Sequence, residues 1–196
     1  MSGKTFFCLD LVKRRREVIN TPINKVMYVY CDYQPAFHEL ATADPNVTFT
    51  NSIQDLNNLT CSPCLIVVDD QMDLISNNKE VGNIISNWFI KKAHHSQTSI
   101  ICIQQNAFAD KFININRNTN YTFFFDLQSD KSVLVTKGRQ CCPGNPGFLL
   151  DAYQKSMNLR NFGYLMLEFH PGRTYKKYWV RSHLDPVPEC EIYTPK

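Results

Sequence analysis

Long apolar runs, internal repeats and low-complexity tracts are all absent from this sequence of 196 residues. No apolar run approaches the ~20 residues that a membrane-spanning helix needs, and the first residues lack the charged and then apolar pattern of a signal peptide. We therefore expect a soluble, intracellular protein with no membrane partner. The net charge of +3 is small, so it permits a nucleic-acid partner without arguing strongly for one.

A complete set of zinc ligands is also absent, although the sequence contains 8 cysteines. Cys61 and Cys64 have the spacing of half a zinc site, but no second pair with ligand spacing follows, and His94 and His95 are adjacent. Several other cysteines lie within apolar runs, where cysteine acts as a small hydrophobic residue. The pattern favours reduced, buried thiols.

Short apolar, β-branched and aromatic runs alternate with longer helical patterns along the chain. Continuous apolar runs are typical of strands in a parallel sheet that is covered on both faces. We therefore predict an α/β three-layer fold of the P-loop NTPase type, with a mainly parallel sheet, as one domain over residues 1–184 and a tail over 185–196. The expected strands are 26–31, 65–68, 99–103, 122–125 and 164–169, and the expected helices are 6–18, 82–95 and 148–158.

The first residues match the second half of a phosphate-binding loop. In the Walker A signature G-x-x-x-x-G-K-[ST], backbone N–H groups point at phosphate oxygens. Gly3, Lys4 and Thr5 occupy its last three positions, so the first glycine and the preceding strand would lie before Met1. Gly3 would let the backbone approach the phosphates, Lys4 would reach the β- and γ-phosphates, and Thr5 would bind Mg²⁺. The alternative is a frayed terminus with a solvated lysine.

An apolar strand over residues 65–68 ends in two carboxylates, which is the form of a Walker B motif. Asp69 would bind Mg²⁺ through water, and Asp70 would orient and activate the attacking water. Ligands bind outside the carboxyl ends of strands in open α/β sheets, so this position suits a site. A core strand that ends in a solvated turn is the alternative, but the phosphate-loop residues upstream favour nucleotide hydrolysis.

The next expected strand, over residues 99–103, ends in Gln104, Gln105 and Asn106. Amides at this position suit a sensor that bonds the γ-phosphate or the attacking water. Amides are also frequent at turns, so the residues alone support an ordinary capping role equally well.

Further short motifs follow one another in order along the chain. They are VMYVYCDYQP at 26–35, VVDDQM at 67–72, AHH before SII at 93–101, QNAF at 105–108, DKS at 130–132, GRQ at 138–140, CPG at 142–144 and YLML at 164–167. In order and spacing they resemble the genome-packaging ATPases of the FtsK–HerA superfamily. The similarity is to the type carried by Polinton (Maverick) elements, virophages and related double-stranded DNA viruses, with the poxvirus packaging ATPase more distant.

The resemblance implies a motor that hydrolyses ATP with Mg²⁺ and drives double-stranded DNA into a viral capsid. It also implies a ring-shaped homo-oligomer, located in the host nucleus or in a cytoplasmic virus factory, and in the virion. Carried over by position, Lys4 and Thr5 bind phosphate and metal, Asp69 binds the metal, Asp70 acts on the water and Gln105 is the sensor. Ring motors also need a cation from the neighbouring subunit where charge develops on the phosphoryl group.

Two arginines are candidates for that arginine finger. Arg139, within GRQ, is the first candidate, and Arg117 is the second; a solvated surface arginine is at least as good an account of Arg117. The basic run at residues 13–16 could contact DNA, serve as a nuclear import signal or form a solvated helix end, and the helix dipole favours the last.

The sequence departs from the family in two places. The front of the phosphate loop is missing, so we expect residues 1–196 to bind ATP poorly, and residues 113–116 stand where the family often carries arginine. The alternative function is therefore a truncated, non-catalytic remnant that keeps a nucleic-acid or partner-binding surface. A P-loop kinase is disfavoured because no arginine-rich lid segment is present.

Overall fold

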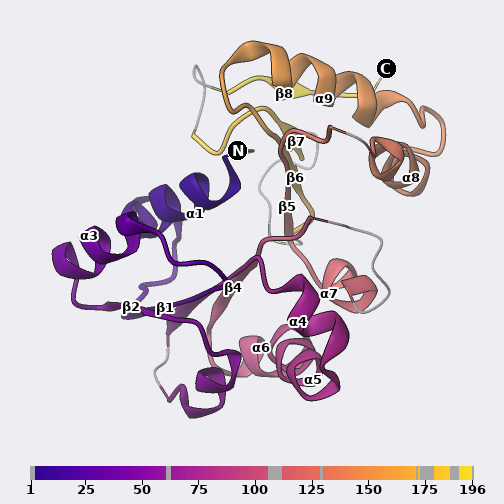
Figure 1. The fold of residues 1–196 in the computed structure, drawn as a ribbon. Coiled ribbons are helices and arrows are strands. Elements are labelled where there is room, and N and C mark those ends of the chain that lie inside the picture. The colour runs from indigo at the N-terminus through magenta and orange to yellow at the C-terminus, as the bar shows by residue number, and fades with distance from the viewer. Residues whose placement is uncertain are drawn as a thin grey trace. The chain divides into compact units, whose positions relative to one another are not determined.

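The computed structural model divides the chain into two compact units, one over Lys4–Asn118 and one over Thr119–Lys196 that also includes Met1–Gly3. Figure 1 labels the elements of both. The structure describes residues 3–60, 63–105, 112–128, 130–170, 172, 179–185 and 190–195.

The first unit, Lys4–Asn118, is built on a parallel sheet with the strand order β2-β1-β3-β4. Three of its strands were predicted, which confirms an α/β arrangement with a parallel sheet for this unit. The edge strand β2 was not predicted, because an apolar and polar alternation only four residues long is a weak signal. The strands are β1 (Lys25–Tyr30), β2 (Val47–Thr50), β3 (Cys64–Asp69) and β4 (Ser99–Cys102).

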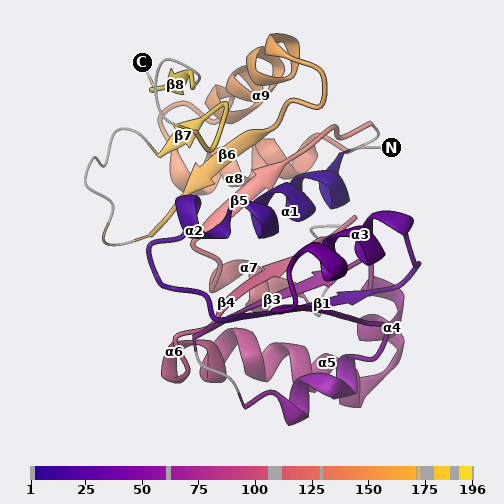
Figure 2. The same ribbon diagram turned by 90° about the vertical axis from the view of Figure 1, so that its left-hand side faces the viewer.

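Helices cover both faces of this sheet. Figure 2 shows α1 and α3 on one face and α5 and α6 on the other, which gives three layers within the unit. The predicted helix over residues 82–95 is observed as α5, a π-helical turn and α6. The helical elements are α1 (Lys4–Lys13), α2 (Arg15–Val18), α3 (Pro35–Ala43), η1 (Ile53–Asn58), α4 (Met72–Asn77), α5 (Lys79–Asn87), η2 (Trp88–Lys92), α6 (Ala93–His95) and α7 (Ile113–Arg117).

The central strand β3 is buried along its whole length. Ile66 and Val68 belong to a core cluster that also contains Ile85 and Trp88 from the α5 side. Because successive side chains of a strand point to opposite faces, Asp69 points to the face that α1 and α3 cover. The Asp69 carboxylate therefore lies at the end of β3, on the face of the sheet that α1 covers (Figure 2).

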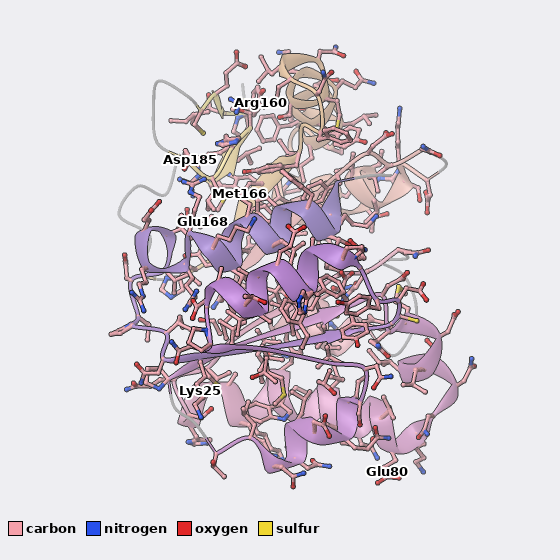
Figure 3. All side chains as sticks on the ribbon, turned by 60° about the vertical axis from the view of Figure 1, so that its left-hand side comes forward. Lys25, Glu80, Arg160, Met166, Glu168 and Asp185 are labelled. Atoms are coloured by element: carbon pink, nitrogen blue, oxygen red, sulfur yellow. The ribbon has the colours of Figure 1, made fainter. Side chains whose placement is uncertain are left out.

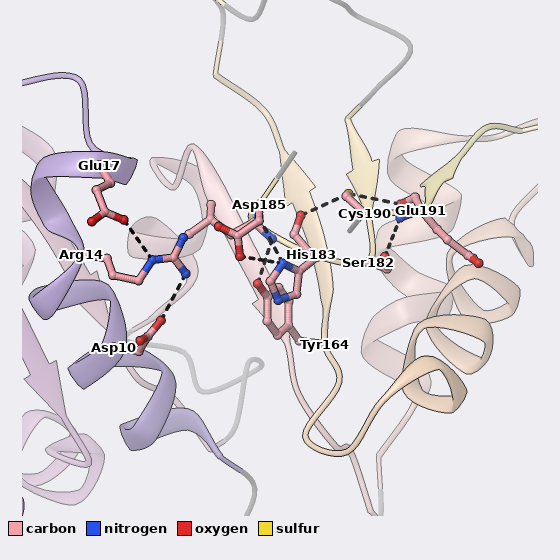
Figure 4. Close-up of polar contacts among 10 residues, drawn as sticks. Asp10, Arg14, Glu17, Tyr164, Ser182, His183, Asp185, Cys190 and Glu191 are labelled. Carbon is pink, nitrogen blue, oxygen red and sulfur yellow. Dashed lines mark hydrogen bonds and ion pairs between the residues drawn. The ribbon is translucent and has the colours of Figure 1, made fainter. Parts of the chain in front are cut away.

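The basic run at residues 13–16 does not form a uniform solvated surface. Arg15 is only 3% exposed, donates to the carbonyl of Val12 at 2.9 Å and pairs with Asp44 Oδ2 at 2.6 Å. Arg14 lies at the surface, within 3.5 Å of Asp10 and 3.4 Å of Glu17 (Figure 4). One arginine of the run is therefore structural, and it ties the end of α1 to the end of α3.

We expect Asp44→Asn to destabilise the protein by about 3 kcal/mol at pH 7, because it leaves the buried Arg15 guanidinium without its counter-charge. The hydrogen bond from Arg15 lowers the pKa of Asp44 below its ordinary value of 3.8. A lowered folded-state pKa means that the stabilisation is present above pH 3.8 and is lost as the pH falls through the folded-state value. Urea unfolding at pH 7 and pH 3 measures both effects.

The matched control for this prediction is Asp10→Asn, which makes the same chemical change in an exposed ion pair. It should alter the free energy of unfolding by less than about 1 kcal/mol. Equal losses for the two variants, or a loss for Asp44→Asn that is as large at pH 3 as at pH 7, would contradict a charge-based role for Asp44.

The second unit contains an antiparallel sheet with the order β5-β6-β7-β8. Two of its strands coincide with the predicted strands 122–125 and 164–169, but the expected parallel direction is wrong for them. Apolar content alone does not distinguish a parallel strand from an antiparallel strand that is also covered. The elements are β5 (Tyr121–Phe124), α8 (Ser132–Cys141), α9 (Phe148–Leu159), β6 (Leu165–Glu168), β7 (Val180–Arg181) and β8 (Ile192–Tyr193).

Side-chain contacts join the end of the chain to this second sheet. The Ser182 hydroxyl accepts a hydrogen bond from the Glu191 N–H at 2.8 Å, and the Cys190 thiol donates to the His183 carbonyl (Figure 4). On β6, whose Met166 and Glu168 are labelled in Figure 3, Glu168 pairs with Arg181 at 2.7 Å. Across the described residues, none of the helices has the length and apolar character that crossing a membrane requires.

Candidate active site

Asp69 lies at the carboxyl end of β3 and is only 5% exposed. Two hydroxyl groups donate hydrogen bonds to its carboxylate: Tyr28, from the neighbouring strand β1, at 2.7 Å to Oδ2, and Thr5, from the first turn of α1. Burial raises the pKa of the Asp69 carboxyl, whereas these hydrogen bonds and the positive charge of Lys4 oppose that rise. Asp69 is thus a buried carboxylate that protein donors hold in one position.

Asp70 follows Asp69 directly but has a different environment. Its side chain is exposed and its φ is 54°, in the left-handed region that aspartate tolerates better than most residues. Gln105 Nε2 donates to Asp70 Oδ1 at 2.7 Å, and the Gln105 backbone N–H lies 2.9 Å from Met72 Sδ. The left-handed residue turns the chain sharply after β3, so the two carboxylates occupy separate environments.

Strand register explains why Asp70 and Gln105 meet. β3 and β4 are adjacent parallel strands, with Val68 paired to Cys102, so their carboxyl ends lie at the same edge of the sheet. The predicted placement of Asp70 beside Gln105 follows from that register. Asn106, predicted with Gln105 to end the sensor strand, lies outside the described residues.

Lys4 and Thr5 form the first turn of α1, so the positive end of the helix dipole lies at the same edge of the sheet. Gly3 precedes the helix with φ 77°, a left-handed conformation that glycine adopts without strain. Three elements that are distant in the sequence therefore converge: the start of α1, the end of β3 and the end of β4.

The two candidate arginine fingers are exposed side chains that belong to different units. Arg139 is exposed on α8 and belongs to the second unit, so the structure does not group it with Asp69 and Asp70. Arg117 is the exposed last residue of α7 in the first unit. Within the described part of the first unit, no hydrogen bond or ion pair joins Arg117 to Asp70.

Two thiols lie near Asp69, that of Cys8 buried and that of Cys102 partly buried. Burial raises the pKa of Cys102 to about 12, and it also raises the pKa of Cys8, with the Asp69 charge acting in the same direction. Both thiols therefore stay protonated at neutral pH and pack as small hydrophobic groups. The cysteines that the structure describes are free thiols, while Cys61 lies outside the described residues.

The Thr5 hydroxyl and the Asp69 carboxylate fit a magnesium ion, because both are hard oxygen donors and they lie within one hydrogen bond of each other. In the described part of the chain, no group of three or more His, Cys, Asp or Glu side chains is arranged to hold a metal ion. A metal at Asp69 would thus take most of its ligands from water and from a bound phosphate, as Mg²⁺ commonly does.

The role of Tyr28 is a feature that the sequence analysis missed. A hydroxyl-bearing residue within the apolar strand VMYVY was the available signal, because a buried tyrosine hydroxyl usually needs a polar partner. That partner is Asp69, one strand away. Tyr28 therefore joins Thr5, Asp69, Asp70 and Gln105 in the cluster at the carboxyl edge.

Comparisons of the chain with models of known families, with curated proteins and with solved structures gave no match. The geometry of the cluster and the chemistry of its side chains are therefore the grounds for assigning a function. The relevant groups are Lys4 and the Thr5 hydroxyl at the start of α1, the buried carboxylate of Asp69, the exposed carboxylate of Asp70 and the amide of Gln105.

Proposed function

We propose that the chain is a P-loop-type ATPase that moves double-stranded DNA into a viral capsid. One observation carries the proposal: Thr5, Asp69, Asp70 and Gln105 converge at the carboxyl edge of a parallel sheet, with Lys4 close enough to act on Asp69. The same edge is the usual ligand site of open α/β sheets. The order of motifs along the sequence supports the more specific role in genome packaging.

Lys4 and the start of α1 provide the positive charge for the nucleotide phosphates. The lysine is a point charge for the β- and γ-phosphates, and the helix dipole adds to it. Thr5 and Asp69 would hold the magnesium ion, which neutralises charge on the phosphates when it is bound. The hydrogen bond that now joins the two groups supports this pairing, because it places both oxygens on one side of the site.

Asp70 and Gln105 act on the attacking water and the γ-phosphate. The exposed Asp70 carboxylate can accept the proton of a water molecule, and Gln105 holds that carboxylate through one N–H. A glutamine amide has two N–H groups, so Gln105 can donate the second to the γ-phosphate. The pair thereby couples recognition of the γ-phosphate to placement of the base.

Activity in a ring needs a contribution from the neighbouring subunit. Arg139 is exposed on α8, so its guanidinium is free to enter the site of another copy, where charge develops on the phosphoryl group. Exposed Lys13 and Arg16 offer DNA contacts that depend on phosphate charge and not on base sequence. Such contacts suit a motor that must move along any sequence.

We expect Lys4→Ala to weaken Mg-ATP binding and to lower ATP turnover by on the order of 10²-fold, the effect of removing one preorganised charge at the phosphates. Lys25→Ala is the matched control, because Lys25 is exposed at the amino end of β1, whereas the cluster lies at the carboxyl ends of the strands. Isothermal titration with Mg-ATP and phosphate release measure the two effects in a protein extended to include the front of the phosphate loop. If Lys4→Ala and Lys25→Ala have the same Mg-ATP affinity and ATP turnover, Lys4 does not bind the phosphates. That result would favour the non-catalytic remnant.

A further inference from the structure

Tyr28 is fully buried, and its hydroxyl makes the hydrogen bond of 2.7 Å to Asp69 Oδ2. β1 and β3 are paired in parallel, with Tyr28 opposite Val67, so the hydroxyl reaches Asp69 diagonally across two neighbouring strands. A tyrosine hydroxyl inside an apolar layer is costly to bury without a partner, and so is a carboxylate. Each of the two groups therefore satisfies the other.

The ring of Tyr28 is fixed by aromatic neighbours. Its centroid lies 5.3 Å from that of Phe37 on α3 and 5.2 Å from that of Phe49 on β2. Phe37 and Phe49 themselves stack at 4.8 Å with an angle of 15° between their planes. A ring packed against two others inside a close-packed core has no room to turn its hydroxyl away. The position of the hydroxyl is therefore set by the fold, independently of any ligand.

Thr5 also donates to Asp69, but it differs from Tyr28 in an important way. Thr5 lies in the first turn of α1, is only partly buried, and is itself a candidate ligand for metal. The Tyr28 hydroxyl is not a candidate metal ligand, because it belongs to a fully buried side chain and donates to Asp69 Oδ2. Tyr28 is thus the donor to Asp69 whose position a bound metal would not need to change.

We propose that Tyr28 is a positioning residue that holds the Asp69 carboxylate in the orientation in which it binds Mg²⁺. The inference rests on the proposed function of the same cluster. Groups that orient a metal-binding carboxylate from behind typically change metal affinity by about 10–100-fold when they are removed. If Tyr28 has this role, removing its hydroxyl weakens metal binding. Removing the hydroxyl of a purely structural tyrosine would not.

The test is Tyr28→Phe, which removes only the hydroxyl and keeps the ring packed against Phe37 and Phe49. Mn²⁺ binding to the protein, alone and with the non-hydrolysable analogue AMP-PNP, should weaken by about 10–100-fold. The Mg²⁺ concentration for half-maximal ATPase should rise by a similar factor, while kcat at saturating Mg²⁺ changes little. Tyr30→Phe, two residues along the same strand, is the control and should leave both values unchanged.

A stability comparison checks the link to Asp69 without any need for activity. Tyr28→Phe should reduce the urea midpoint less in an Asp69→Asn background than in the parent, because the charge that the hydroxyl serves is gone. Equal reductions in the two backgrounds, or unchanged Mn²⁺ binding in a folded Tyr28→Phe protein, would overturn the inference. A parent without ATPase activity would end the proposed function, whereas Mn²⁺ binding and the stability comparison would still decide the role of Tyr28.

Discussion

Asp70→Asn should lower ATP turnover by about 10²–10⁴-fold, the range expected when a general base is lost. The substitution isolates this role well. Asparagine tolerates the left-handed backbone that Asp70 adopts at φ 54°, and its side-chain oxygen can still accept the hydrogen bond from Gln105. The variant therefore keeps the geometry and loses only the ability to take a proton from water. Phosphate release and Mg-ATP binding should be measured on the same preparation.

Asp70→Asn should bind Mg-ATP as the parent does, so the fall in ATP turnover should appear as a lower kcat. Asp73→Asn is the control, because it removes the same charge from an exposed position in the first turn of α4. Its turnover should stay close to that of the parent. If Asp70→Asn turns over ATP as fast as the parent, the base has been assigned to the wrong residue.

The second large effect is recovery of activity when two inactive proteins are mixed. An Asp70→Asn subunit lacks the base but still carries Arg139, and an Arg139→Ala subunit lacks the guanidinium but keeps Asp70. Mixed rings contain some interfaces at which an intact Asp70 meets an intact Arg139 from its neighbour. Part of the parental ATPase rate should therefore return on mixing, although each protein alone is nearly inactive.

Co-assembly must be shown separately, for example by pull-down of one tagged subunit with the other. The same experiment with Arg117→Ala in place of Arg139→Ala distinguishes the two candidate arginines. Recovery with Arg117→Ala alone would assign the finger to Arg117. No recovery with either variant, in rings that are shown to be mixed, would argue against a finger in trans at these positions.

Much of the candidate site could be predicted from the sequence because parallel strands bring their carboxyl ends together. Two acidic residues after one buried strand and an amide after the next were enough to assign Asp70 and Gln105 to one proposed site, although the hydrogen bond between them was not predicted. The hydrogen bond between Tyr28 and Asp69 could not be predicted in the same way. It depends on which strand lies beside β3 and on which face each side chain takes, and both are set by tertiary packing.

The fold was predicted less completely in the second half of the chain. Residues 122–125 and 164–169 were placed as strands because they are apolar and aromatic, but their direction depends on the connections between them. β2 was missed because it is short, and Arg15 looked like one member of a solvated basic run. Only the packing of α1 against the end of α3 makes Arg15 a buried partner of Asp44.

Phosphate release by the purified protein, extended to include the front of the phosphate loop, with Mg-ATP and linear double-stranded DNA, tests the central claim most directly. Asp69→Asn gives the background, because it removes the buried carboxylate of the proposed metal site. The account predicts steady release well above that background, dependent on Mg²⁺, stimulated by DNA and weakened steeply by salt as counterion release requires. Release that never exceeds the Asp69→Asn background, from a folded parent protein, would contradict it.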